Sequence, residues 1–193
     1  MINRLHVKFI LLSAALSPLF FTSKAMAFEE PVAGISVALE AYYEEQAAKI
    51  YDVSLSSELQ DYTYDLCKEY GVDFDLAIAI MDGESEYDIM AFGVNDNGST
   101  DSGLMQINSC NHEWLEEELG ITDFFDPKQN ILCGVFMLAD LMERHDDVHE
   151  ILICYNMGER TMRKLRKKGI YTTEYSRKVV SKMKKLRKEG IKL

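Results

Sequence analysis

The sequence has no apolar stretch long enough to cross a membrane as a helix. Its main apolar run, from Phe9 to Phe21, covers 13 residues, whereas a membrane-spanning helix needs about 20. A mean hydropathy of −0.15 excludes a protein with several spans. The composition, with 47% hydrophobic and 27% charged residues, is that of a globular chain. A length of 193 residues suffices for one compact domain with an appendage.

Fingerprints of bound metals and nucleotides are also missing from the sequence. His145 and His149 are spaced i, i+4, but no third ligand or His-Glu-x-x-His pattern accompanies them. Residues 95–101 are acidic, yet an EF-hand register with Gly98 in the sixth position would place Gly93 in the first. There is no phosphate-binding loop and no dinucleotide fingerprint. We therefore expect neither a metal nor a cofactor.

The first residues predict a secretory signal peptide. Arg4 and Lys8 precede the apolar run, and residues 25–27 follow the small-x-small cleavage pattern. The prediction is that residues 1–27 are removed, with an uncleaved anchor as the alternative. In either case the rest of the chain is expected to be exported to the periplasm, the cell wall or the extracellular space.

Charge is strongly segregated along the chain, whose net charge is −11. The leader carries +3, residues 28–159 carry −26, and the part from Arg160 onward carries +12. A basic end on an acidic body predicts an anionic partner for that end. In an exported protein this means wall polymers or a membrane surface rather than nucleic acid. The alternative is that the basic end only neutralises the body.

Four cysteines permit two disulfides in an exported chain, with three possible connectivities. Cys110 and Cys133 flank one helix-and-loop segment, and we favour that pair. Cys67 and Cys154 lie on apolar helical faces, where they fit buried free thiols equally well.

Start and stop signals predict a mainly α-helical domain. Residues 28–55 are expected to form an acidic lead-in with one helix over 35–50, residues 56–180 the domain, and residues 181–193 a basic C-terminal tail. Helices are predicted over 57–70, 73–84, 111–120, 127–144, 147–157, 162–168 and 174–188. The strongest signals are the capping box Ser57-x-x-Gln60 and the helix start Asp126-Pro127. Asn97-Gly98 predicts a turn in a loop or small hairpin over 87–103.

Glu84 is the candidate catalytic acid. It lies near the end of a strongly apolar helix, and apolar surroundings raise a carboxyl pKa toward neutrality, as cleavage of a glycosidic bond requires. The helix C-terminus is also the negative end of the helix dipole, which disfavours the carboxylate further. A single glutamate at a helix end is not specific by itself.

Three motifs in order make the signal specific. Glu84-Ser85 is followed by Gly103-Leu104-Met105-Gln106-Ile107-Asn108 and then by Tyr155-Asn156-Met157-Gly158. Over about residues 57–180 this set resembles the lysozyme-like lytic transglycosylases of the SLT-domain family. The resemblance implies a lysozyme-like α+β fold with a small irregular hairpin after the catalytic helix, and cleavage of peptidoglycan glycan strands. Gly83 and Cys154 depart from the family pattern, and Gly83 lowers helix propensity beside the catalytic group.

The resemblance implies that Glu84 is the only catalytic carboxylate. It would protonate the oxygen between N-acetylmuramic acid and N-acetylglucosamine, with the substrate's own acetamido group stabilising the cationic carbon. The resulting carboxylate would take the proton of the sugar's C6 hydroxyl, which closes a 1,6-anhydro ring without water.

The same resemblance implies a set of substrate-binding residues: Ser85, Met105, Gln106, Asn108, Tyr155, Asn156 and Tyr175. Ser85, Gln106 and Asn108 would line the glycan groove, with Met105 as an apolar wall. Tyr155 and Asn156 would face the catalytic glutamate, Tyr155 as a donor to the substrate, and Tyr175 would close the cleft. A core role for Met105, a helix-end role for Asn156 and a local backbone bond for Ser85 remain alternatives.

A second, local resemblance points to hydrolysis. Residues 98–109, which include Asp101, also resemble animal-type lysozymes, in which a second carboxylate acts as nucleophile or stabiliser. Asp101 matches that carboxylate, and the alternative is a residue of a polar turn. A water-using muramidase is therefore the runner-up activity.

Two further classes of function are compatible with the sequence. One is a glycan-binding scaffold on an inactive lysozyme-like fold, and the other is an accessory factor of a secretion or conjugation machine that docks through its basic tail. We expect a monomer.

Overall fold

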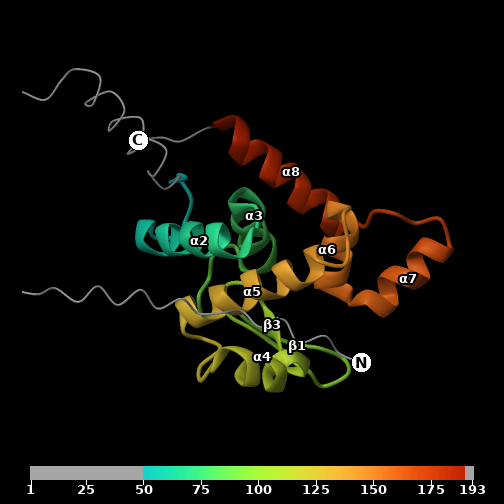
Figure 1. The fold of residues 1–193 in the computed structure, drawn as a ribbon, viewed down its shortest axis with the longest axis horizontal. Helices are drawn as coiled ribbons and strands as arrows, with labels where there is room; N and C mark the ends of the chain where they lie inside the picture. Colours follow the sequence, from blue (N-terminus) through green and yellow to red (C-terminus); the bar gives the residue numbers. More distant parts are fainter. Residues whose placement is uncertain (1–49, 190–193) are drawn as a thin grey trace, which may run out of the picture. The chain divides into compact units, whose positions relative to one another are not determined.

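The structure is a computed structural model that describes residues 50–189. The expected signal peptide and almost all of the lead-in helix lie outside the described residues. All described residues belong to one compact unit (Figure 1). Its elements are α2 (Ser57–Tyr70), α3 (Phe74–Ser85), β1 (Phe92–Val94), β2 (Thr100–Ser102), β3 (Ile107–Asn108), a 3₁₀ helix (Ser109–Asn111), α4 (His112–Leu119), α5 (Pro127–Met142), α6 (Val148–Met157), α7 (Glu159–Lys167) and α8 (Glu174–Glu189).

Helix α3 is the centre of the core. The five consecutive residues 77–81 are fully buried, because α2 and α8 both pack on this helix. Helix α5 packs on α2 and α6 and also contacts β3, so it lies between the helical part and the sheet (Figure 1). The predicted class, mainly α with a small β element after the catalytic helix, is confirmed.

The β element is a three-stranded antiparallel sheet in the order β1-β2-β3. Asp101 of β2 pairs with Gly93 of β1 and with Asn108 of β3. The turn between β1 and β2 is closed by the Asn95 amide, which donates to the Ser99 carbonyl. The hairpin was predicted, but β3 was not, because two residues carry no alternation that a sequence pattern could reveal.

The start of α2 differs from the predicted capping box by one residue. Ser56, not Ser57, is the N-cap, and its hydroxyl oxygen accepts from the Leu59 amide at 3.3 Å. The Gln60 side chain therefore does not close a capping box; it is 1% exposed and turns toward the preceding segment.

That preceding segment is fixed to the domain. Gln60 donates to the carbonyls of Tyr51 and Leu55 and accepts from the Tyr51 amide at 2.7 Å. Tyr51 and Leu55 are both buried, and the Tyr51 hydroxyl donates to Asp75 at 2.5 Å. The folded unit thus includes the last residues of the lead-in that the sequence placed outside the domain.

Helix α8 crosses the boundary that the sequence placed after residue 180. Met183 and Leu186 are buried, Lys182 pairs with Asp82 at 2.6 Å, and Arg187 pairs with both Asp73 and Asp75. Residues 181–189 are therefore a packed part of the domain rather than a separate basic tail.

The favoured disulfide between Cys110 and Cys133 is wrong, since all four cysteines are free thiols. Cys110 is exposed in the 3₁₀ helix, whereas Cys133 is fully buried inside α5. Burial raises the pKa of the Cys67 and Cys133 thiols to about 12, which makes both unreactive. Between residues 50 and 189 no helix is long and apolar enough to span a membrane.

Candidate active site

Glu84 occupies the last turn of α3, where its side chain is half-buried. Burial raises the pKa of this carboxyl to about 7, and the negative charge of Asp101 acts in the same direction. The Tyr175 hydroxyl donates to Glu84 Oε1 at 2.5 Å and opposes the rise, because this bond favours the carboxylate. Near neutral pH both protonation states of Glu84 are therefore populated.

Gly83 explains how Tyr175 reaches Glu84. A Cβ at this position would lie 3.3 Å from Val179 Cγ2 and 3.9 Å from the Tyr175 ring. The missing side chain thus allows α8 to pack closely against the end of α3. The glycine that the sequence marked as a departure from the family serves this helix contact.

An open groove of about 710 Å³ passes Glu84. Of the expected site residues, six line it: Glu84, Asp101, Gln106, Asn108, Tyr155 and Asn156. Trp114 of α4 and Met137 of α5 add apolar surface suited to a sugar face. Trp114 was missed, although the chain's only tryptophan in a short, otherwise acidic helix was a usable signal.

The floor of the groove is the turn from Gly103 to Asn108, held by Asn130 of α5. The Asn130 side chain is fully buried, accepts from the Met105 amide and donates to the carbonyls of Ser102 and Phe124, each at 2.8 Å. Gly103 has φ 72°, and a Cβ there would lie 2.5 Å from Asn130 Nδ2. Asn130 is a positioning residue that sequence reasoning did not assign to the site.

Three residues other than glycine adopt left-handed backbone conformations around this site. They are Glu86 (φ 51°), Tyr87 (φ 68°) and Gln106 (φ 46°). Such conformations are unfavourable for L residues and persist where surrounding contacts enforce them. Gln106 is held by its own side chain, which donates to the carbonyls of Ala91 and Gly103. The strain lies directly after α3 and on the groove floor at Gln106, where the chain turns sharply.

Asp101 is held in the groove by two amides. Its Oδ2 accepts from Asn95 at 2.8 Å and its Oδ1 from Asn108 at 2.7 Å. The alternative of a turn residue is wrong for Asp101, because it lies in β2, while Asn97 accepts from the Ser99 amide and forms the side-chain turn. Asp101 is thus a fixed second carboxylate that faces the same groove as Glu84.

The side chains of three expected substrate-binding residues make contacts inside the protein. Met105 is fully buried, so the prediction that it forms a groove wall is wrong. The Tyr155 hydroxyl donates to the Met105 carbonyl at 2.9 Å, while the residue also lines the groove. Ser85 donates to the carbonyls of Met81 and Leu104, which ties α3 to the groove floor. Burial is the main cause of the raised pKa of Tyr155, which keeps this hydroxyl protonated.

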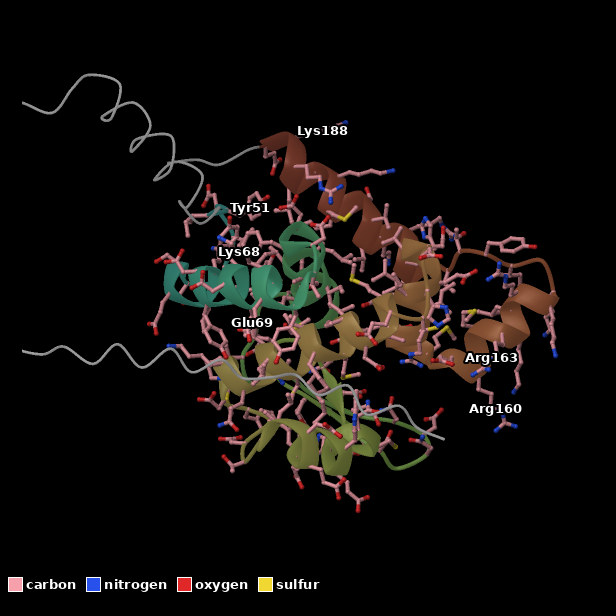
Figure 2. All side chains as sticks on the ribbon, in the orientation of Figure 1. Tyr51, Lys68, Glu69, Arg160, Arg163 and Lys188 are labelled. Atoms are coloured by element: carbon pink, nitrogen blue, oxygen red, sulfur yellow. The ribbon has the colours of Figure 1, made fainter. Side chains whose placement is uncertain are left out.

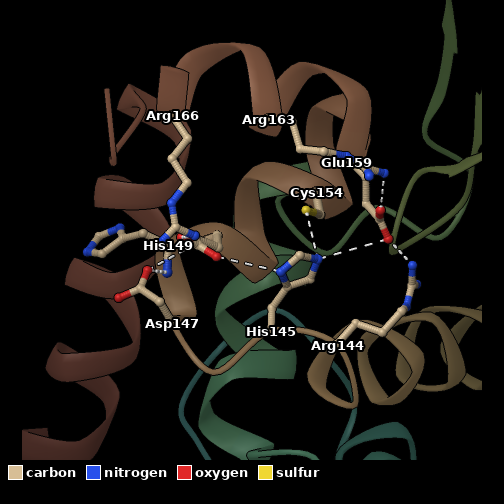
Figure 3. Close-up of polar contacts among 9 residues, drawn as sticks. Arg144, His145, Asp147, His149, Cys154, Glu159, Arg163 and Arg166 are labelled. Carbon is tan, nitrogen blue, oxygen red and sulfur yellow. Dashed lines mark hydrogen bonds and ion pairs between the residues drawn. The ribbon is translucent and has the colours of Figure 1, made fainter. Parts of the chain in front are cut away.

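One end of the groove carries a network of charges (Figure 3). Glu159 lies between Arg144 and Arg163 and pairs with both. His145 Nε2 lies 3.6 Å from Cys154 Sγ, and its Nδ1 lies 3.6 Å from a Glu150 carboxylate oxygen. Within residues 50–189, no group of three or more His, Cys, Asp or Glu residues could hold a metal ion.

A helical domain with a small sheet, an open groove and a half-buried glutamate with a pKa near neutrality defines the class of lysozyme-like glycan-cleaving enzymes. The family described as "Transglycosylase SLT domain" matches residues 62–176. The chain belongs to this family of lytic transglycosylases, as the sequence motifs predicted.

Individual relatives agree with this assignment. Invasion protein IagB of Salmonella typhimurium is 32% identical over 112 residues, which cover 56% of this chain and 69% of that protein. Membrane-bound lytic murein transglycosylase F of Desulfosudis oleivorans is 35% identical over 96 residues, 46% of this chain and 19% of that protein. The fold is similar to lytic transglycosylase Slt of Pseudomonas aeruginosa, solved as an inactive glutamate-to-glutamine mutant. The TM-score is 0.54 at 18% identity, over 76% of this chain and 27% of that one.

Proposed function

We propose that this chain cleaves the bond between N-acetylmuramic acid and N-acetylglucosamine in peptidoglycan and leaves 1,6-anhydro ends. The observation that carries the proposal is the Glu84 carboxyl, which faces an open groove with a pKa raised to about 7. A group that must first give a proton and then take one works best when its pKa is near the working pH. The similarity to a membrane-bound lytic murein transglycosylase supports the same substrate class.

In the first step Glu84 is protonated and gives its proton to the glycosidic oxygen. The bond from that oxygen to C1 of N-acetylmuramic acid breaks, and N-acetylglucosamine leaves with the new hydroxyl. The carbonyl oxygen of the substrate's acetamido group shares its electrons with C1 and stabilises the positive charge there. Tyr175 occupies one carboxyl oxygen, Oε1, which leaves Oε2 for the proton transfer.

In the second step Glu84 is a carboxylate, and the Tyr175 bond stabilises it in that form. It takes the proton from the C6 hydroxyl, and O6 attacks C1 as the acetamido oxygen leaves. The products are a 1,6-anhydro ring and a protonated Glu84, so the enzyme returns to its starting state without consuming water.

Hydrolysis is the second candidate, and Asp101 is the observation that favours it. Its carboxylate faces the groove and is fixed by Asn95 and Asn108, so it is placed to stabilise C1 while Glu84 activates a water molecule. The two activities differ in their products, not in the first proton transfer.

Mass spectrometry of digested peptidoglycan tests both activities, with the chain from Phe28 to Leu193 beside its Glu84→Gln and Asp101→Asn variants. Products lighter by one water than reducing-end muropeptides support the transglycosylase. Reducing ends that disappear in the Asp101→Asn variant support the muramidase instead. Full activity of the Glu84→Gln variant would remove the basis of both proposals and leave a glycan-binding role.

The proposed place of action is the cell wall or periplasm, reached through the signal peptide predicted over residues 1–27. The similarity to a protein named for invasion supports local wall opening as the purpose of cleavage. N-terminal sequencing of the exported chain tests the cleavage site, and a first residue other than Phe28 would contradict it.

A further inference from the structure

Helix α7 presents a row of cations to the surface. Arg160, Arg163, Lys164 and Lys167 are spaced i, i+3, i+4 and i+7, which places them on one face of the helix. All four are exposed and line a shallow hollow of about 290 Å³. Figure 2 shows Arg160 and Arg163 on α7, well away from Lys188 in the last turn of α8.

The ion pairs of α7 anchor its inner side and leave this row largely unneutralised. Arg166 pairs with Glu150 of α6, and Arg163 shares Glu159 with Arg144 (Figure 3). Within residues 50–189, the ion pairs give no acidic partner to Arg160, Lys164 or Lys167.

The basic residues of α8 are of two kinds. Lys178, Lys182, Lys185 and Arg187 pair with acidic side chains, two of them with residues of the α3 region. Within residues 50–189, the ion pairs give no acidic partner to Arg177, Lys184 or Lys188. Two of the α8 ion pairs join that helix to the α3 region. Free cations alone therefore do not distinguish α7 from α8; the difference lies in the side chains beside them.

Two exposed hydrophobic side chains adjoin this row. Ile170 is 42% exposed and Tyr171 is 59% exposed, in the loop directly after α7. The opposite side of α7 holds Met162, which is buried, and Leu165, which packs against the core. The helix is thus fixed to the domain on one side, while cations followed by Ile170 and Tyr171 face outward.

We propose that α7 and the Ile170-Tyr171 loop bind the surface of an anionic phospholipid membrane. Lipid headgroups attract such a cluster of cations, and a tyrosine beside an apolar side chain suits the boundary between headgroups and acyl chains. A wall polymer would use the cations but would gain little from Ile170 and Tyr171. Residues 28–159 carry −26, so their repulsion from the membrane orients α7 toward it.

This contact would place one end of the groove at the membrane. Gly158 and Glu159, the residues at the start of α7, line that end. Docking through α7 therefore directs cleavage to glycan strands that lie close to the lipid surface. The inference rests on the proposed export but not on the reaction type.

Binding to vesicles tests the proposal. The chain from Phe28 to Leu193 keeps the whole compact unit that begins at Gln46. It is sedimented with vesicles of phosphatidylcholine, with and without phosphatidylglycerol. The α7 variant is Arg160→Gln/Lys164→Gln/Lys167→Gln. The matched control is Arg177→Gln/Lys184→Gln/Lys188→Gln, which removes one Arg and two Lys from the exposed face of α8.

We expect binding only to the vesicles with phosphatidylglycerol. The α7 variant should lose about 100-fold in affinity, since each cation near an anionic surface contributes about five-fold. The α8 control should lose less than about three-fold in affinity, because the proposal places its three cations away from the membrane contact. Ile170→Ser/Tyr171→Ser should weaken vesicle binding about ten-fold even in high salt, because the contribution of these two side chains is hydrophobic and salt does not screen it.

Equal losses in the α7 and α8 variants would overturn the proposal, because binding would then follow net charge alone. Binding of the native chain to a soluble anionic wall polymer but not to vesicles would overturn it as well. Activity on soluble glycan fragments should be the same in the native chain and in all of these variants. The Glu84→Gln variant should bind vesicles normally, so failure of the membrane proposal and failure of the proposed reaction are separate results.

Discussion

At the scale of single residues, the environment of the Glu84 carboxyl controls its protonation, on which the proposed chemistry depends. Burial raises its pKa to about 7, while Tyr175 donates to it and favours the charged form. A carboxyl left in water would be charged at neutral pH and could not begin the reaction as an acid. The two opposing effects keep both forms accessible to one residue, as a single acid/base requires.

The raised pKa predicts how stability depends on pH. The unfolded chain has Glu84 near its ordinary pKa of 4.5, so between 4.5 and about 7 the folded state binds more protons. The contribution of Glu84 is therefore fully present below pH 4.5 and is lost as the pH rises through about 7. The loss amounts to at most about 3 kcal/mol. Glu84→Gln should be more stable than the native chain at pH 8 and about equally stable at pH 4, as measured by urea unfolding. A stability difference that does not change with pH would contradict the raised pKa.

Tyr175→Phe removes the hydrogen bond that favours the Glu84 carboxylate. The pKa of Glu84 should rise further, which moves the falling limb of the profile of kcat/KM against pH to higher pH. We also expect kcat to fall about ten-fold, because a bond to a charged group is worth roughly 1.5 to 3 kcal/mol. Tyr171→Phe is the matched control on an exposed tyrosine outside the groove. An unchanged pH profile in Tyr175→Phe would show that Tyr175 has no influence on the acid.

Residues whose role is local or part of a motif could be predicted from the sequence, and residues whose role depends on a distant partner could not. Glu84 could be predicted because it lies at the C-terminal end of a strongly apolar helix. The Tyr155 hydroxyl, by contrast, donates to the backbone of Met105, which is fifty positions earlier in the chain. No pattern near Tyr155 indicates that partner, so a substrate contact was predicted where the protein has an internal bond.

At the scale of elements, the groove floor depends on one side chain from α5. Asn130→Ala leaves the Met105 amide and the carbonyls of Ser102 and Phe124 without their side-chain partner. We expect a loss of about 3 kcal/mol in the free energy of unfolding, together with reduced activity, because Gln106 and Asn108 lie on this floor. Gln129→Ala is the control, since Gln129 is a neighbouring amide whose bonds to residues 122 and 123 are exposed. Urea unfolding should give a loss below about 1 kcal/mol for it. Similar losses in both variants would contradict the positioning role of Asn130.

The helices could be predicted because their ends carry local signals. Asp73, Asp126 and Asp147 accept from the first amides of α3, α5 and α6, and Gly120 ends α4 in a left-handed conformation. These are contacts within a few residues, which a sequence shows directly. Strand β3 has only two residues and is defined by its pairing with β2. The choice of Ser56 as N-cap of α2 goes with the Gln60 side chain bonding to Tyr51 and Leu55 instead of closing a capping box. Both were therefore beyond a sequence pattern.

At the scale of the whole molecule, the segregated charge has two separate uses. The sequence shows an acidic body and a basic end but not how they meet. In the structure, Lys182 and Arg187 of α8 pair with Asp82 and Asp73 of the α3 region, which joins the end of the chain to the catalytic helix. Part of the basic end is thus a folding element, and α7 is the part for which we propose a partner.

This assignment predicts the effect of truncation. A chain from Phe28 that ends at Gly169 lacks all of α8, including Tyr175 at Glu84 and the buried Val179 and Leu186. It should lose cooperative unfolding and also lose activity on soluble glycan fragments, which need no docking. A chain that ends at Glu189 keeps every described element and should behave as the native chain.

A truncated chain that still folds and cleaves soluble fragments would mean that the ion pairs of α8 are not needed for the fold. If the shorter chain unfolded cooperatively and still cleaved soluble fragments, α8 would be dispensable for the fold and the ion pairs with the α3 region would contribute little. Its buried face argues against that outcome, since exposing side chains of this size costs about 1.5 to 3 kcal/mol each, against a total stability of about 5 to 15 kcal/mol for a typical domain. Because α8 also brings Tyr175 to the catalytic carboxyl, we expect folding and activity to be lost together.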